Sequence, residues 1–203
     1  MASNFIDDLN RVSVLIMMAI IGVLSFINNI SLTFVIKYLF NGLINYFLKL
    51  GFKYGMRDDE FLIIGKGTRP DGAINCGNFM DEFLDKNIVH GAVTSYGFPS
   101  GHAQSCGFFA IFIHSYFRHN PLIYYPFILY SLYIPYTRLE FGCNTIKQVI
   151  FGYIYCIIFF YILENIQNLM ISQKNYVIYY FRNRNQKKKK NKIILIWQQI
   201  EDV

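Results

Sequence analysis

The chain has 203 residues, of which 54% are hydrophobic, 18% aromatic and 16% charged, and it carries a formal net charge of +6. This high content of apolar residues is unusual for a soluble domain and indicates an integral membrane protein. The apolar residues are grouped in long uncharged blocks, as membrane-spanning helices require.

Residues 12–48 form the first apolar block, in which Lys37 is the only charged residue. The polar residues Asn28, Asn29 and Ser31 near its middle predict a hairpin of two short spans, each near the roughly 20 residues that a bilayer needs. A single long, tilted helix is the alternative.

Three further apolar blocks follow, and each is predicted to be one span. They cover residues 103–117, 121–136 and 148–163, the last extended by 165–172. Each block is somewhat short for a span, but flanking tyrosine, histidine, lysine and arginine side chains can reach the membrane interface. The predicted fold is therefore all-α, a polytopic membrane helical bundle of about five spans over residues 1–173.

The C-terminal residues 174–203 form a basic tail, in which residues 174–192 carry many lysines and arginines and no acidic residue. The positive-inside rule places this tail in the cytoplasm, where anionic lipid headgroups would attract it by about 1 kcal/mol per basic residue. A nucleic-acid role for the lysine run at 187–190 is less favoured behind several spans. With the tail inside, the polar loop over residues 49–100 and the loop before the last span both face the lumen or the exterior.

The four cysteines show no metal-ligand spacing, and the acidic residues of the polar loop form no compact oxygen-ligand pattern. We therefore expect no metal site and no cofactor. Cys76 and Cys143 lie in loops on the same predicted face and could pair in an oxidising compartment, but two loop thiols alone slightly favour the free form. Cys106 and Cys156 are predicted to be small core residues.

Pro99, Ser100, Gly101 and His102 spell P-S-G-H at the entrance to the block at 103–117. A helix that starts here offers unpaired N–H groups and a positive dipole end to an anion, and Gly101 lets the backbone turn tightly before it. Ser100 could cap the helix or donate its hydroxyl to a phosphate oxygen, and His102 can donate or accept a proton near neutral pH. Without companions, the string would fit an ordinary capped helix equally well.

Two arginines accompany this string, Arg69 before it and Arg138 after it. Arginine holds phosphate oxygens with a planar bidentate fork, and an arginine beside a membrane span is costly without a role. Lys66 lies in a glycine-containing basic loop that could wrap a phosphate, although an exposed surface lysine fits equally well. Lys49 and Lys53 lie further upstream. Together these residues predict phosphate chemistry at a membrane surface.

In order and spacing, R-P at Arg69, P-S-G-H and the segment 137–152 resemble the type 2 phosphatidic acid phosphatase and vanadium haloperoxidase superfamily, whose pattern is K-x6-R-P, P-S-G-H and S-R-x5-H-x3-D. The resemblance covers roughly residues 60–155 and points to the membrane lipid phosphatase branch. It implies a helical bundle that hydrolyses phosphate monoesters or diphosphates of lipids. The residues it implies in phosphate binding are Arg69, Ser100, Gly101 and Arg138, with His102 as proton donor.

The third motif departs from the pattern at its two central positions. Asn144 stands in place of the nucleophilic histidine and Gln148 in place of the aspartate that orients it, while Thr137 keeps the hydroxyl of the motif's serine. An amide nitrogen has no available lone pair for attack on phosphorus. The first motif has Leu62 where its lysine is expected, which makes Lys66 the best substitute cation. The site is therefore predicted to be weak or inactive as a phosphatase.

Three functions fit these residues. The preferred one is a phosphatase-like membrane protein, a pseudoenzyme, that binds phosphorylated lipids with little or no turnover. The second is an active lipid phosphatase with His102 as proton donor and a substitute nucleophile, for which a loop could bring His90 toward the site. The third is a structural membrane protein that needs none of these residues.

Overall fold

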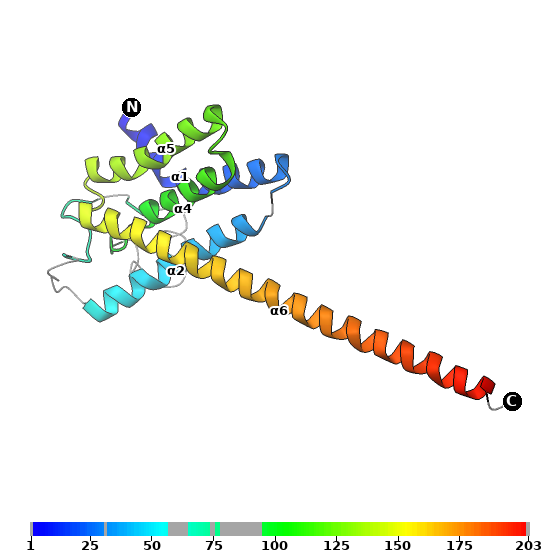
Figure 1. Cartoon of the computed structure of the whole chain (residues 1–203). Helices are drawn as coiled ribbons and strands as arrows, with labels where there is room; N and C mark the ends of the chain where they lie inside the picture. Colours follow the sequence, from blue (N-terminus) through cyan, green and yellow to red (C-terminus); the bar gives the residue numbers. More distant parts are fainter. Residues whose placement is uncertain (1, 31, 57–64, 74–75, 78–94, 202–203) are drawn as a thin grey trace. The chain divides into compact units, whose positions relative to one another are not determined.

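The structure is a computed structural model. It describes residues 2–30, 32–56, 65–73, 76–77 and 95–201. These residues form five α-helices and no strand, with one isolated antiparallel bridge between Thr68 and Tyr96 (Figure 1). The chain divides into two units, Met1–Phe160 and Tyr161–Val203. The all-α fold class predicted from the sequence is confirmed.

The first unit is a helical bundle built around α4. Its helices are α1 (Ala2–Ile27), α2 (Thr33–Met56), α4 (Gly101–Phe117) and α5 (Pro121–Glu140), and α6 (Ile146–Glu201) begins in it. Helix α4 contacts α1, α2 and α5. Because most of its residues are apolar or small on every face, it suits the centre of a bundle rather than its surface.

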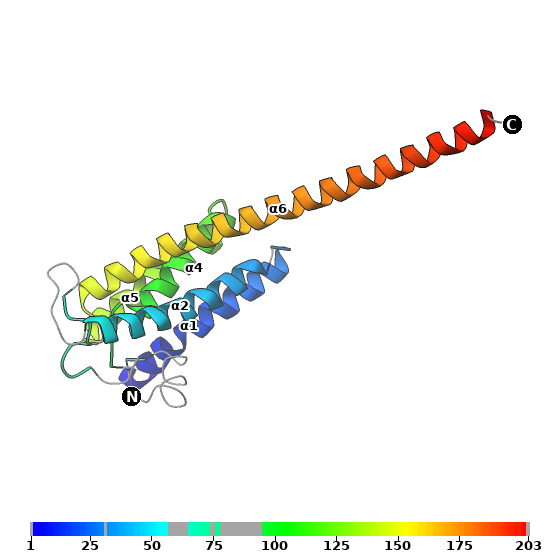
Figure 2. The ribbon, with the colours of Figure 1, turned by 90° about the horizontal axis from the view of Figure 1, so that it is seen from below.

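Helices α1 and α2 form the predicted hairpin and lie side by side (Figure 2). Asn29 turns the chain with a φ of 53°, in the left-handed region that asparagine tolerates better than most residues. The side-chain amide of Asn28 donates to the Leu24 carbonyl at 2.9 Å, so it caps the last turn of α1. The alternative of one long tilted helix is wrong, because the chain reverses at these two asparagines.

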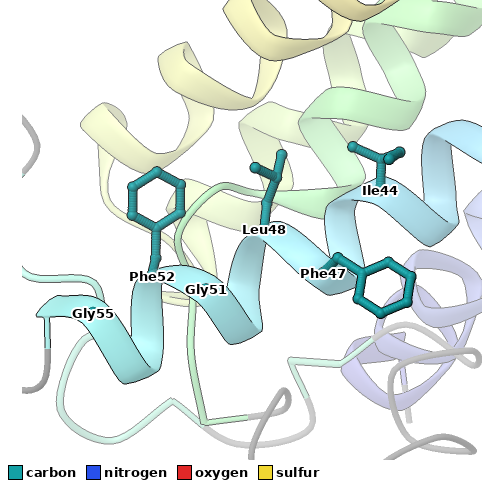
Figure 3. Close-up of a pocket in the computed structure, with 6 residues that line it drawn as sticks. All are labelled: Ile44, Phe47, Leu48, Gly51, Phe52 and Gly55. Atoms are coloured by element: carbon teal, nitrogen blue, oxygen red, sulfur yellow. The ribbon is translucent and has the colours of Figure 1, made fainter.

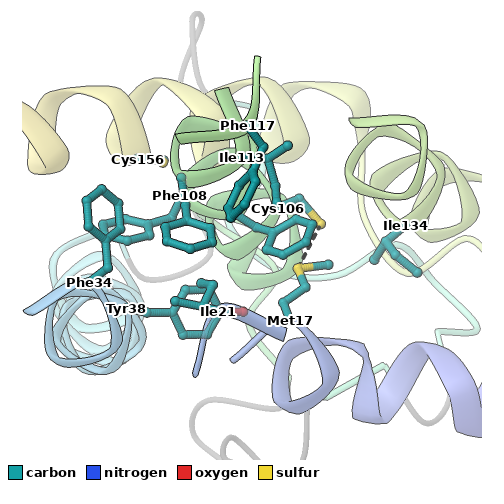
Figure 4. Close-up of a cluster of buried hydrophobic side chains, with 12 residues drawn as sticks. Met17, Ile21, Phe34, Tyr38, Cys106, Phe108, Ile113, Phe117, Ile134 and Cys156 are labelled. Atoms are coloured by element: carbon teal, nitrogen blue, oxygen red, sulfur yellow. Dashed lines mark hydrogen bonds between the residues drawn. The ribbon is translucent and has the colours of Figure 1, made fainter. Parts of the chain in front are cut away.

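One cluster of buried side chains joins all five helices within the first unit (Figure 4). Its members are Met17, Ile21, Phe34, Tyr38, Cys106, Phe108, Phe109, Phe112, Ile113, Phe117, Ile134 and Cys156. Phe34 of α2 lies with its ring centroid 5.1 Å from that of Phe112 and 5.8 Å from that of Phe108, both on α4. The cluster also holds Cys106 and Cys156 as fully buried free thiols, as the sequence predicted.

Small residues allow the first part of α6 to pack very closely against α4. A Cβ atom on Gly152 would lie 2.6 Å from the Ser100 carbonyl oxygen and 3.0 Å from the Ala103 Cβ. A Cβ on Gly107 would lie 2.8 Å from a ring carbon of Tyr153, whose hydroxyl donates to the Ser131 carbonyl at 2.9 Å. This close approach places the chain just before α6 against the start of α4, where the candidate site lies.

Helix α2 is longer than the sequence predicted. The polar loop was expected to begin at residue 49, but the helix continues to Met56. Lys49 is only 2% exposed, so this lysine faces the interior of the unit instead of marking the start of a solvated loop. Helix α5 likewise extends beyond the expected end at residue 136, to Glu140.

The second unit consists of the rest of α6, which is a continuous helix to Glu201. Within the described residues, only Ile146–Tyr180 is helical, apolar and long enough to cross a bilayer, and Val12–Ile27 is a shorter apolar helix. The count of about five spans and the domain boundary at residue 173 stay predictions.

Candidate functional site

The P-S-G-H segment forms the N-terminus of α4. Ser100 is the N-cap, and its hydroxyl oxygen accepts from the Ala103 N–H at 3.4 Å. This is one of the two roles that the sequence predicted for it. Gly101 and His102 begin the first turn, and both are buried. The positive end of the α4 dipole and its first N–H groups therefore lie next to His102 inside the unit.

Asn144 of the third motif lies directly against this helix start. Its Oδ1 accepts from the Ser100 hydroxyl at 3.4 Å. Its Nδ2 donates to the Gly97 carbonyl at 3.0 Å and to the Gln148 Oε1 at 3.0 Å. The structure thus brings together the second and third motifs, which are far apart in sequence.

Gln148 connects three segments of the site and is fully buried. Its Oε1 accepts from the Asn144 side chain and from the Thr145 N–H at 3.1 Å. Its Nε2 donates to the carbonyl of Lys66 at 3.2 Å and to that of Thr68 at 2.8 Å. A carboxylate here would keep the acceptor role and lose both donated bonds, because an ionised carboxylate has no hydrogen to donate.

The two candidate arginines belong to the same region. Arg69 Nη1 donates to the Cys143 carbonyl at 3.0 Å, and Arg138 Nη2 donates to the Cys76 carbonyl. Arg138 is only 2% exposed, and its own carbonyl accepts from the N–H of Asn144 at 3.1 Å. Arg138 is therefore buried beside Asn144 of the third motif.

Cys76 and Cys143 form a disulfide with a Cα–Cα distance of 5.4 Å across a sequence separation of 67 residues. The expectation that favoured free thiols is wrong. The two loops meet because the first and third motifs converge, and no local sequence signal encodes such a long-range approach.

The structure does not bring the Lys66 side chain into the site. That side chain is exposed, and the residue contributes through its backbone carbonyl, which accepts from Gln148. Lys49 is buried, and Asn45, one turn before it on α2, donates to the Pro99 carbonyl at 3.3 Å. Leu62 and His90 lie outside the described residues.

Sequence reasoning missed a polar face on α2. Lys37, Asn41, Asn45 and Lys49 are spaced four residues apart and are all buried. Asn45 Nδ2 donates to the Gln104 Oε1 at 2.8 Å, and Gln104 Nε2 donates to the Asn41 Oδ1 at 2.8 Å. The i, i+4, i+8, i+12 spacing within an apolar run is the signal that could have found this face.

An apolar hollow of 510 Å³ runs along α2 beside the site (Figure 3). It is lined by Ile44, Phe47, Leu48, Gly51, Phe52 and Gly55. The Phe52 ring lies edge-on to the ring of Phe98 with centroids 4.8 Å apart, and the Phe52 carbonyl accepts from the Tyr96 hydroxyl at 3.3 Å. Through Phe98, the hollow adjoins the segment that leads into P-S-G-H.

Within the described residues, no group of three or more histidine, cysteine, aspartate or glutamate side chains is arranged to hold a metal ion.

The profile of the PAP2 superfamily matches residues 12–170, which is more than half of the chain. The chain therefore belongs to the PAP2 superfamily, as its motifs indicated. Comparisons with curated proteins and with solved structures find no match.

Proposed function

We propose that this PAP2 superfamily member is a multi-pass membrane protein that binds phosphorylated lipids and hydrolyses them weakly or not at all. Membership of the superfamily supports a phosphatase-like function related to lipids. The observation that carries the proposal is the amide pair at the reacting positions, where Asn144 and Gln148 are hydrogen-bonded to each other and to the surrounding backbone.

The environment of Asn144 argues against turnover by the covalent route. Both hydrogens of its amide nitrogen are donated, one to Gly97 and one to Gln148. This nitrogen has no available lone pair, so it cannot form a bond to phosphorus as an imidazole nitrogen does. Proton donation by His102 alone would accelerate the reaction by about 10²- to 10⁴-fold, far less than the acceleration that phosphate ester hydrolysis requires.

The retained groups support anion binding. The start of α4 supplies backbone N–H groups and a positive dipole end, with Ser100 and His102 beside them. Arg69 and Arg138 each donate through one guanidinium nitrogen to a backbone carbonyl, which restricts the plane of each guanidinium. Cations fixed in a buried setting attract a phosphate more strongly than mobile surface cations do.

Two features support a lipid rather than a soluble phosphate ester. Large apolar side chains are exposed along the outer surfaces of the helices, where an aqueous surface would favour polar groups. The hollow along α2 adjoins the P-S-G-H segment through Phe52 and Phe98, so a hydrocarbon chain could lie there while its phosphate occupies the site.

The proposed topology places the site in the lumen or outside the cell and the basic residues 174–203 in the cytoplasm, in contact with anionic lipid headgroups. The Cys76–Cys143 disulfide supports this orientation, since disulfides persist in oxidising compartments. About five spans give this arrangement, with residues 1–173 in the membrane bundle.

Replacement of Arg138 tests the proposed site. Arg138→Ala should weaken binding of phosphatidic acid to the purified protein in lipid nanodiscs by at least about tenfold, since a hydrogen bond to a charged group contributes about 1.5 to 3 kcal/mol. Arg118→Ala is the matched control, because Arg118 is exposed at the other end of α4 and should leave binding unchanged.

Thermal unfolding of each variant separates lost binding from lost folding. Arg138→Lys keeps the positive charge but lacks the paired N–H donors of the guanidinium group, so it should bind with intermediate affinity. Equal binding by Arg138→Ala and the unmodified protein would refute the site.

Filling the hollow tests the lipid part of the proposal. Gly51 lies in the hollow, and a Cβ there would meet nothing within 4 Å. Gly51→Leu should therefore fold, yet weaken binding of long-chain phosphatidic acid by about tenfold or more, since each buried methylene contributes about 0.8 kcal/mol. Binding of inorganic phosphate should stay the same.

Gly42→Leu is the control for this variant. Gly42 also has open space around it but lies nine residues earlier on α2, on the opposite face of the helix. If both variants weaken lipid binding equally, the hollow has no specific part in it.

A further inference from the structure

The two arginines of the candidate site share one anchor. Arg138 donates to the carbonyl of Cys76, and Arg69 donates to the carbonyl of Cys143 at 3.0 Å. These two cysteines are the two halves of a single disulfide. Each arginine is thus held by the backbone of one half-cystine.

The two hydrogen bonds connect the segment that contains Arg69 and Cys76 with the segment that contains Arg138 and Cys143, and each arginine donates to the segment to which it does not belong. Arg69 lies shortly before Cys76 in the sequence but bonds to Cys143, and Arg138 lies shortly before Cys143 but bonds to Cys76. Neither bond would hold its arginine in place if the two segments separated. The disulfide is the covalent link between these segments, and both of its residues are nearly fully buried, at 4% and 3% exposure.

We propose that the Cys76–Cys143 disulfide is a positioning element for the anion site, so that the oxidised protein binds phosphate more tightly than the reduced protein. The inference rests on the proposed function, since it takes Arg69 and Arg138 to be phosphate ligands. Both cystine carbonyls orient guanidinium groups, and the covalent link fixes the distance between those two carbonyls.

The chemical step is a two-electron thiol–disulfide exchange with a dithiol reductant. The bond between the Cys76 and Cys143 sulfurs breaks, each sulfur ends as a thiol, and the dithiol supplies two electrons and two protons as it closes into its own disulfide. Cys106 and Cys156 are already free thiols, so they accept no electrons in this step.

Linkage makes the effect reciprocal. If the disulfide raises phosphate affinity, then bound phosphate must stabilise the disulfide by the same factor and lower its reduction potential. A tenfold difference in affinity corresponds to a shift of about 30 mV for this two-electron couple. If reduction left the phosphate affinity unchanged, phosphate would not change the reduction potential.

The test uses the 203-residue chain in lipid nanodiscs, titrated with inorganic phosphate before and after reduction with dithiothreitol. The reduced protein should bind phosphate about tenfold more weakly, and saturating phosphate should lower the disulfide's reduction potential by about 30 mV. Cys76→Ser with Cys143→Ser should bind weakly in either condition. Cys106→Ala should respond to the reductant as the unmodified protein does.

Three results would overturn the inference: equal phosphate affinity in both redox states, a potential that phosphate does not change, or helix unfolding on reduction, seen by circular dichroism. Failure of the proposed function gives a different pattern, in which the oxidised protein itself binds no phosphate and Arg138→Ala has no effect.

Discussion

Purified protein in lipid nanodiscs should release phosphate from phosphatidic acid, lysophosphatidic acid and an isoprenyl diphosphate at the background rate or only slightly above it. Asn144→His should raise that rate by at least about 10²-fold, because it supplies an imidazole nucleophile at the start of α4, where His102 is the proposed proton donor. The hydrogen bonds around Asn144 are compatible with a histidine at this position. Asn144 donates to the Gln148 Oε1 at 3.0 Å, and an imidazole Nδ1–H at this position could donate to the same oxygen.

That bond would leave the other imidazole nitrogen with its lone pair available for phosphorus, so Gln148 could orient the ring without a carboxylate. The control is His102→Ala in the Asn144→His background, which should return the rate to the background level. Robust release by the unmodified protein that depends on His102 would contradict the proposal and favour an active phosphatase with a substitute nucleophile.

Gln148→Asp and Gln148→Glu should both destabilise the protein, by about 3 to 5 kcal/mol at neutral pH. Gln148 is fully buried and donates to two backbone carbonyls, those of Lys66 and Thr68. A carboxylate would face these two oxygens without a hydrogen to offer, and its charge would be buried. Completing the superfamily pattern with aspartate at this position should therefore harm the fold rather than improve the site.

Thermal unfolding in nanodiscs measures the loss, and Gln173→Glu is the matched control because Gln173 lies on the same helix and is exposed. The decrease in the free energy of unfolding caused by Gln148→Glu should become smaller as the pH falls. Burial raises a carboxyl pKa, so the folded variant takes up the proton first, and the protonated acid can donate to one of the carbonyls. A melting temperature equal to that of the unmodified protein at neutral pH would contradict the assigned role of Gln148.

Local features of this protein were predictable because the interactions behind them span a few residues. Asn28 and Asn29 interrupt an apolar run, and both the capping amide and the left-handed φ act within one helical turn. Ser100 before the α4 block predicted an N-cap for the same reason. The order and spacing of the three motifs predicted the superfamily, which the profile match confirms.

Helix length was harder to predict where a polar residue faces the interior. Lys49 looked like the beginning of a loop, because a lysine after an apolar block usually faces water. Lys49 is buried because other parts of the unit pack around α2. The periodicity of the sequence does not reveal which helix packs against the polar face of α2. The helix therefore continues to Met56, and the polar face with Asn41 and Asn45 became visible only with Gln104 of α4 opposite it.

The sequence by itself determined the helical class, the hairpin, the capped start of α4 and membership of the superfamily. Only the tertiary structure decided that Cys76 pairs with Cys143, that Gln148 donates to Lys66 and Thr68, and that each arginine bonds across to the opposite segment. These contacts join residues many tens of positions apart. Like the close approach of α4 and α6 at Gly107 and Gly152, they are a property of packing and not of any short stretch of sequence.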